Sequence, residues 1–235
     1  MKVSIVISVY ESYEAVRRQM RYFAKLGLQD VEVIIVDDGS EPPIPGAAYR
    51  TGNRLAWTQG LGRNLGASHA QGEYLLFTDI DHILSAEAIQ DVKAFTSERM
   101  MFPRYLGVLL QDGTLSQDPV VLAEYGAVIG RRGLYASVHQ NTFGIKRASF
   151  EALGGYDPSH SLMGYHPLTK GGDEVNFNVK WKHWAAKNGV GIAMGSPIYM
   201  FPVGRFHVRG ETNPMGLFHN LSYVPVKAMK GEEHG

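Results

Sequence analysis

Apolar residues open the chain in a run, then recur at helical spacing, and then form a second run. Residues 3–9 are mainly β-branched and apolar, which is typical of a buried strand. After Ser12, a possible N-cap, the spacing of apolar residues predicts an amphipathic helix that ends near Gly27. Residues 31–36 predict a second strand. This strand–helix–strand order predicts a parallel sheet, whose ligands bind beyond the carboxyl ends of the strands.

Helices and strands continue to alternate along the rest of the chain. Further helices are predicted over residues 61–69 and 85–95 (with Ser85 as N-cap), from Arg147 to 154, and from Asp173 to 187. Further strands are predicted over residues 74–78, 137–145, 191–194 and 198–201, while residues 103–133 predict only strand and loop. Residues 156–172 show no period, as in lids and binding loops. We therefore expect an α/β fold of one domain, with a mostly parallel sheet flanked by helices.

The composition narrows the range of partners and compartments. Lys plus Arg and Asp plus Glu both number 23, so no net field draws the protein to nucleic acid. The chain has no cysteine, which excludes disulfides and thiolate metal sites and favours a cytoplasmic location. The apolar run at the N-terminus is too short for a signal peptide or a membrane span, so we expect no transmembrane segment.

Two aspartates, Asp79 and Asp81, follow directly on the predicted strand 74–78. Strand alternation would place both carboxylates on one side, where the sheet opens to a crevice. Carboxylate oxygens suit Mg²⁺ or Mn²⁺, and either ion keeps positions open for diphosphate oxygens. The plain alternative is a solvated turn, because an Asp-x-Asp pair is common by chance.

Four motifs in chain order resemble the GT-A glycosyltransferases, especially the large family 2. They are residues 3–10, 36–40 (Val-Asp-Asp-Gly-Ser), 62–66 (Gly-Arg-Asn-Leu-Gly) and 77–81 (Phe-Thr-Asp-Ile-Asp). The resemblance implies a nucleotide-binding half over about residues 1–100, in which Ser8 and Tyr10 line the nucleoside pocket. It implies further that Asp38 binds the base or ribose and that Arg63 approaches the diphosphate or base. Alternatively, Tyr10 lies in the core, and Asp37 or Asp38 caps the turn before Gly39.

The second half resembles β-1,4-galactosyltransferases and polypeptide N-acetylgalactosaminyltransferases. The motifs are residues 143–147, 153–157, 171–177 (Gly-Gly-Asp-Glu-Val-Asn-Phe), 207–210 and 213–214. This likeness implies that Glu174 is the catalytic base, that Asp173 helps to bind the acceptor, and that His207 binds the metal with Asp81 and Asp79. For Asp79 two alternatives to direct metal binding stay open: contact with the ribose or donor sugar, and contact with the metal through water. His82 competes with His207, but strand alternation would turn it away from the site.

These features together predict a metal-dependent glycosyltransferase with its domain over residues 1–230, an acceptor-binding half over about 101–230, and a frayed tail at 231–235. The enzyme would move a hexose or N-acetylhexosamine from a UDP-sugar to a hydroxyl of a glycan or other acceptor, using Mn²⁺ or Mg²⁺. Glu174 stands where the retaining family carries an amide, which favours inversion. Two alternatives stay open: a retaining enzyme, and a catalytically silent nucleotide-sugar or glycan-binding module. A nucleotidyltransferase would need a Gly-rich loop with Arg and Lys after the first strand, and residues 10–13 offer none.

Overall fold

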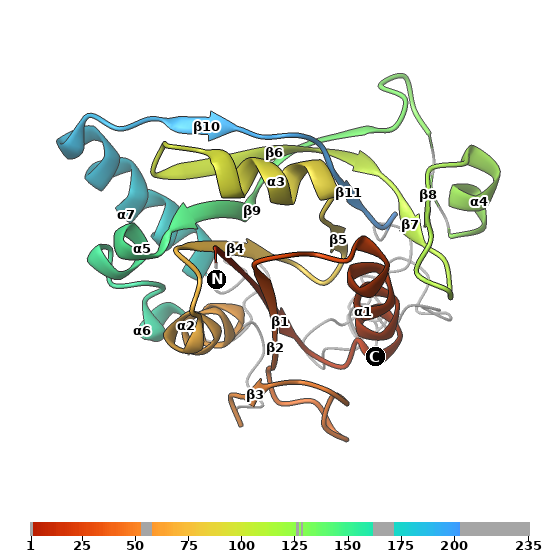
Figure 1. Ribbon diagram of the computed structural model, residues 1–235, viewed down its shortest axis with the longest axis horizontal. Coiled ribbons are helices and arrows are strands. Elements are labelled where there is room, and N and C mark those ends of the chain that lie inside the picture. The colour runs from red at the N-terminus through yellow and green to blue at the C-terminus, as the bar shows by residue number, and fades with distance from the viewer. Residues whose placement is uncertain (1, 53–57, 126, 128, 162–171, 203–235) are drawn as a thin grey trace, which may run out of the picture.

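The computed structural model describes residues 2–52, 58–125, 127, 129–161 and 172–202. Within these residues a large sheet has the strand order β3-β2-β1-β4-β9-β6-β11-β5, and β10 pairs with the first residues of β6 (Figure 1). Its strands are β1 (Val3–Val9), β2 (Val31–Asp37), β3 (Tyr49–Arg50), β4 (Tyr74–Thr78), β5 (His82–Ile83), β6 (Arg99–Leu106), β9 (Tyr135–Lys146), β10 (Ile192–Met194) and β11 (Ile198–Met200). A separate two-stranded sheet pairs β7 (Val108–Leu109) with β8 (Leu115–Ser116).

The large sheet is mixed, with a parallel half that contains the N-terminal strands. Strand β1 pairs in parallel with both β2 and β4, and β2 pairs in parallel with β3. Strand β9 then lies antiparallel between β4 and β6. The carboxyl ends of β1, β2 and β4 consequently meet at one edge, where the amide of Asp38 donates to the carbonyl of Val9 at 2.7 Å. This arrangement confirms the predicted α/β fold with a mostly parallel sheet.

Helices cover both faces of this sheet because its central strands are apolar on both sides. The helices are α1 (Tyr13–Leu26), α2 (Gln59–His69), α3 (Ala86–Ala94), α4 (Pro119–Glu124), α5 (Arg147–Ala152), α6 (Pro158–Ser161) and α7 (Asp173–Asn188). One core joins alternate residues of β1 to α1 and α3, and a second core joins Val6 to α2, α5 and α7. Figure 1 shows α2, α5, α6 and α7 grouped together, away from α1.

Two glycines let helix α2 approach the sheet very closely. A Cβ atom on Gly62 would lie 2.1 Å from Ser8 Oγ, and one on Gly66 would lie 2.4 Å from Val6 Cγ1. Side chains at these positions would push the helix away from β1. The close packing brings the N-terminal part of α2, including Arg63, close to the carboxyl ends of the strands. Ligands of such sheets bind at these strand ends.

Most predicted elements are confirmed within a residue or two, and Ser85 caps α3 by accepting from the amide of Ala88 at 3.0 Å. The prediction of strand and loop over residues 103–133 is confirmed by β6, β7 and β8, but it missed helix α4. Its signals were present in the sequence: Pro119 occupies the first turn, and Asp118 caps it by accepting from Val120 N at 2.7 Å. The predicted loop 156–172 contains α6, and its residues 162–171 lie outside the described part, as does the tail at 231–235.

Candidate active site

The acidic pair predicted from the sequence lies at the carboxyl end of β4, together with a histidine. Asp79, Asp81 and His82 each offer a ligand atom, and these atoms lie within 4.8 Å of one another. The prediction that His82 turns away from the site was therefore wrong. Strand alternation does not extend to it, because β4 ends at Thr78 and the chain turns at residues 79–81 before β5 begins.

His82 is nevertheless already engaged through both ring nitrogens. Its Nε2 lies 2.8 Å from Arg104 Nη1, and its Nδ1 lies 2.6 Å from Thr142 Oγ1. Because arginine only donates hydrogen bonds, Nε2 accepts and Nδ1 carries the proton. Burial, together with the positive charges of Arg104 and Arg63, lowers the pKa of His82 to about 4. His82 is thus a neutral group beneath the acidic pair, with no free lone pair for a metal ion in this arrangement.

Arg63 forms a buried ion pair with Asp79. Its guanidinium is fully buried, and Nη2 donates to Asp79 Oδ1 at 2.6 Å. The same guanidinium donates to Tyr156 Oη at 2.7 Å and to the carbonyl of Asn141 at 2.8 Å. Gln59 also donates to Asp79 Oδ1. The resemblance implied that Arg63 approaches the diphosphate or base, whereas the structure directs its donors to Asp79 and two neighbouring groups.

Asp79 and Asp81 differ in their electrostatic environment. Burial alone would raise the pKa of Asp79, but the charge of Arg63 holds it below its usual value. Burial and the adjacent negative charge of Asp79 instead raise the pKa of Asp81 to about 7. A divalent cation between these carboxylates would remove their repulsion, so the pair fits a hard metal ion.

Asp173 and Glu174 begin helix α7 and extend the acidic cluster. Asp173 Oδ2 accepts from the amide of Gly60 in the first turn of α2 at 2.8 Å, so this carboxylate joins two helix N-termini. Glu174 accepts from the amide nitrogen of Asn141. Burial, followed by the negative charge of Asp79, raises the pKa of Glu174 to about 8. The predicted base, Glu174, is thus close enough to the predicted metal ligand Asp79 for their charges to interact.

The two aspartates at the carboxyl end of β2, Asp37 and Asp38, have different partners. Asp37 caps the turn, because its carboxylate accepts from the amides of Ser40 at 2.8 Å and Ile44 at 3.1 Å. Asp38 accepts instead from the hydroxyls of Thr51 at 2.8 Å and Thr58 at 2.5 Å. Burial raises the pKa of Asp38 to about 6. Asp38 thus ties two segments of chain together at the carboxyl edge of the sheet.

Ser8 and Tyr10, which were predicted to line a nucleoside pocket, lie at the end of β1. Ser8 is buried against Gly62 of α2, and Tyr10 is half-buried one residue beyond the strand. Both positions agree with the expected edge of the sheet. His207, the predicted third metal ligand, lies outside the described residues.

Three residues of the site, Gln59, Arg104 and Asn141, were not predicted from the sequence. Arg104 lies in β6, within the segment for which only strand and loop were predicted. Asn141 and Thr142 are polar and buried within β9, which is a signal that could have been used, because buried polar side chains in a strand need partners. Gln59 carried no comparable signal.

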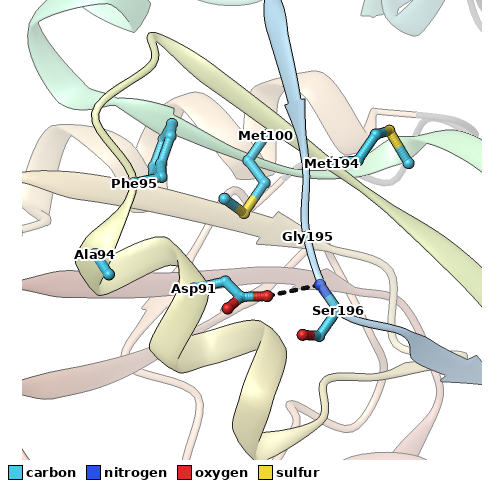
Figure 2. Close-up of a pocket in the computed structure, with 7 residues that line it drawn as sticks. All are labelled: Asp91, Ala94, Phe95, Met100, Met194, Gly195 and Ser196. Carbon is cyan, nitrogen blue, oxygen red and sulfur yellow. Dashed lines mark hydrogen bonds between the residues drawn. The ribbon is translucent and has the colours of Figure 1, made fainter.

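Two cavities among the described residues lie away from this cluster. One, of about 430 Å³, separates α3 from the end of β10 and is lined partly by Phe95, Met100 and Met194 (Figure 2). Its carboxylate, Asp91, accepts from the amide of Ser196 at 2.6 Å. The other, of about 630 Å³, runs along α1 beside Ile44 and is mainly apolar. Neither cavity contains a residue of the acidic cluster. No described helix combines the length and apolar character needed to cross a bilayer.

Sequence comparisons agree with the first resemblance. Residues 4–99 match the family model described as Glycosyl transferase family 2. Curated relatives from two strains of Staphylococcus aureus, both named poly(ribitol-phosphate) beta-N-acetylglucosaminyltransferase TarS, are 27% identical over 110 residues, which cover 42% of this chain. The match spans 19% of each relative's length, so it concerns one part of a much longer protein.

Solved structures extend the similarity of fold across most of the chain. Residues 1–349 of S. aureus TarS give a TM-score of 0.53 at 16% identity, covering 88% of this chain and 62% of that one. The same fragment in complex with UDP gives a TM-score of 0.53 at 16% identity, covering 85% and 60%. The likeness of the second half to galactosyltransferases stays a prediction. Over residues 4–99 the chain is therefore similar to the glycosyltransferases of family 2, and over most of its length it shares the fold of the TarS structures.

Proposed function

We propose that the protein transfers a hexose or N-acetylhexosamine from a UDP-sugar to a hydroxyl of a glycan or similar acceptor, with inversion, using Mn²⁺ or Mg²⁺. The observation that carries this proposal is the acidic cluster, in which Asp79 and Asp81 lie together at the carboxyl end of β4 and Glu174 is linked to Asp79 by hydrogen bonds through Asn141 and Arg63. The UDP complex of TarS supports the choice of nucleotide, and the name of that relative supports an N-acetylhexosamine.

In this proposal Asp79 and Asp81 hold the metal ion, and His207 completes the ligand set. The metal, when bound, would stabilise negative charge on the departing diphosphate. Arg63 and Gln59 fix the orientation of Asp79, while His82 stays neutral and adds no positive charge that would compete with the ion.

Glu174 acts as the general base. As the acceptor oxygen bonds to the anomeric carbon, the bond from that carbon to the UDP oxygen breaks, and the hydroxyl proton passes to a carboxylate oxygen of Glu174. A base whose pKa lies near the working pH is efficient, because it is both ionised and basic enough to take the proton. Burial and Asp79 give Glu174 that property, with a pKa raised to about 8.

Asp173 contributes to the same edge through the helices. Its bond to Gly60 keeps the N-terminus of α7 against that of α2, which fixes where Glu174 stands relative to Asp79. Asp173 is proposed to meet the acceptor from this position, while Ser8, Tyr10 and Asp38 border the nucleoside. The absence of cysteine supports a cytoplasmic location.

A donor-hydrolysis screen over UDP- and GDP-sugars with and without Mn²⁺ tests the proposal. Asp81→Ala and Glu174→Ala should each abolish turnover. The affinity for UDP in the presence of Mn²⁺, measured by calorimetric titration, should fall in Asp81→Ala only. Asp112→Ala is the matched control, because Asp112 is an exposed surface acid paired with Lys25. Full turnover in either site variant would refute the assigned roles. Metal-independent UDP binding without turnover of any donor would favour the silent binding module.

A further inference from the structure

Asn141 lies between the two chemical parts of the site. Strand β9 runs antiparallel to β4, with Phe143 paired to Phe77. The hydroxyl oxygens of the next two residues, Thr78 and Thr142, lie 3.2 Å apart, so Asn141 follows at the end of β4, where Asp79 begins the turn. Asn141 is only 7% exposed, so its partners are protein groups in this structure.

The contacts of Asn141 connect Glu174 to Asp79. Its side-chain amide nitrogen donates to Glu174 Oε1. Its main-chain carbonyl accepts from Arg63 Nη2 at 2.8 Å, and the same nitrogen donates to Asp79 Oδ1 at 2.6 Å. A continuous set of hydrogen bonds therefore runs from the proposed base, through Asn141 and Arg63, to the proposed metal ligand.

The oxygen of the Asn141 side chain bears on why an asparagine occupies this position. This atom, Oδ1, is buried and has no hydrogen-bond partner among the described residues. A buried acceptor without a partner destabilises a fold, and an apolar residue of similar size would avoid that cost. An aspartate would place a third negative charge between Asp79 and Glu174. Asparagine supplies a donor to Glu174 without adding charge, which is the property a carboxylate base needs from its neighbour.

We propose that Asn141 is a positioning residue for catalysis: it holds Glu174 Oε1 by its amide, so that the second carboxylate oxygen is left to take the proton of the acceptor hydroxyl. This inference rests on the proposed function of Glu174 as the base. The main-chain bond to Arg63 fixes Asn141 itself, so the base is held in register with Asp79.

The first test compares Asn141→Ala with a matched control, Asn188→Ala. Asn188 also donates one hydrogen bond through its side-chain amide, to the carbonyl of Trp184 at 2.7 Å, at the far end of α7 from Glu174. Asn141→Ala should lower kcat about 10- to 100-fold, the usual effect of removing a group that orients an active-site ligand. Its donor KM and UDP affinity should change less than its kcat, because the main-chain carbonyl that binds Arg63 is kept. Asn188→Ala should leave kcat unchanged within about two-fold, because its bond is remote from the site.

The second test separates a positioning role from a structural one. In a Glu174→Gln background, Asn141→Ala should cause no further loss of the residual turnover, because the base through which Asn141 acts is absent. Asn141→Ser, which keeps a hydroxyl donor, should recover part of the kcat lost in Asn141→Ala. An equal loss of kcat in both backgrounds, or full turnover in Asn141→Ala, would overturn the inference. Full turnover in Glu174→Gln would instead refute the proposed base, and no transfer by the wild-type protein would refute the proposed function.

Discussion

Replacing Arg63 by methionine removes the buried cation that neutralises Asp79. The substitution keeps a long side chain within the core, but it abolishes the 2.6 Å ion pair and the donors to Tyr156 and Asn141. Breaking a buried ion pair by removing one partner costs about 3–5 kcal/mol. We expect the lower end, about 3 kcal/mol, because the Asp79 side chain keeps 15% exposure and some hydration. For a chain of this size each kcal/mol lowers Tm by about 2–4 °C, so the expected loss is about 6–12 °C.

The pH dependence identifies which contact is responsible. The pKa of Asp79 is lowered in the folded protein, so its contribution to stability is present above the unfolded-state pKa and is lost as pH falls through the folded one. In Arg63→Met, burial acts without the opposing cation, and Asp79 takes up a proton at higher pH. The difference in free energy of unfolding between the two proteins should therefore be large at about pH 7 and shrink towards about pH 4.

Urea unfolding at both pH values, followed by tryptophan fluorescence, measures this difference. Arg17→Met is the control, because Arg17 is paired with Glu14 at 2.5 Å but its side chain is 51% exposed. An exposed pair of this kind contributes about 1 kcal/mol or less. Equal losses in the two variants, or a loss in Arg63→Met that does not change with pH, would refute the reasoning.

Two further perturbations test the metal site and the helix packing. Because the pKa of Asp81 is raised to about 7, Mn²⁺ should increase Tm more at about pH 8 than at about pH 6, and Asp81→Asn should remove the increase; a pH-independent increase would contradict this. Gly66→Ala should destabilise the fold by about 1–3 kcal/mol, since its Cβ would meet Val6 Cγ1 at 2.4 Å. In Gly191→Ala the added Cβ meets no atom within 4 Å, so the free energy of unfolding should change by about 0.5 kcal/mol or less. Equal changes in the two glycine variants, measured by urea titration, would exclude the packing argument.

The fold was predictable where hydrophobic periodicity is strong and uninterrupted. Strand β1 is buried along all seven residues, and the apolar run at residues 3–9 predicts it. Helix α4 is six residues long, with Leu122 as its buried residue, and such a short element has almost no period to detect. The predicted outward direction of His82 failed for a related reason. Alternation is a property of continuous strands, and a turn of unknown geometry separates β4 from β5.

The candidate site was predictable as a set of residues but not as a set of contacts. Motif spacing locates Asp79, Asp81 and Glu174, because strand ends and helix starts bear them. It also locates Arg63, but not the groups that Arg63 contacts. Those contacts depend on how closely α2 packs on β1, a distance that Gly62 and Gly66 set in three dimensions. Asn141 was hidden for the same reason, since its role follows from the antiparallel register of β9 against β4.

The contacts around Arg63 also show that the family-matched segment does not complete the site. Residues 4–99 contain Arg63 and Asp79, but two of the three groups that Arg63 contacts, Tyr156 and Asn141, lie beyond it. The amide of Gly60 likewise binds Asp173 from the second half. A fragment that ends at residue 99 would leave the Arg63 guanidinium with unpaired donors and would expose the edge of β4 that pairs with β9. The geometry of the proposed donor site therefore depends on the same elements, β9 and α7, that carry Asn141 and the proposed base.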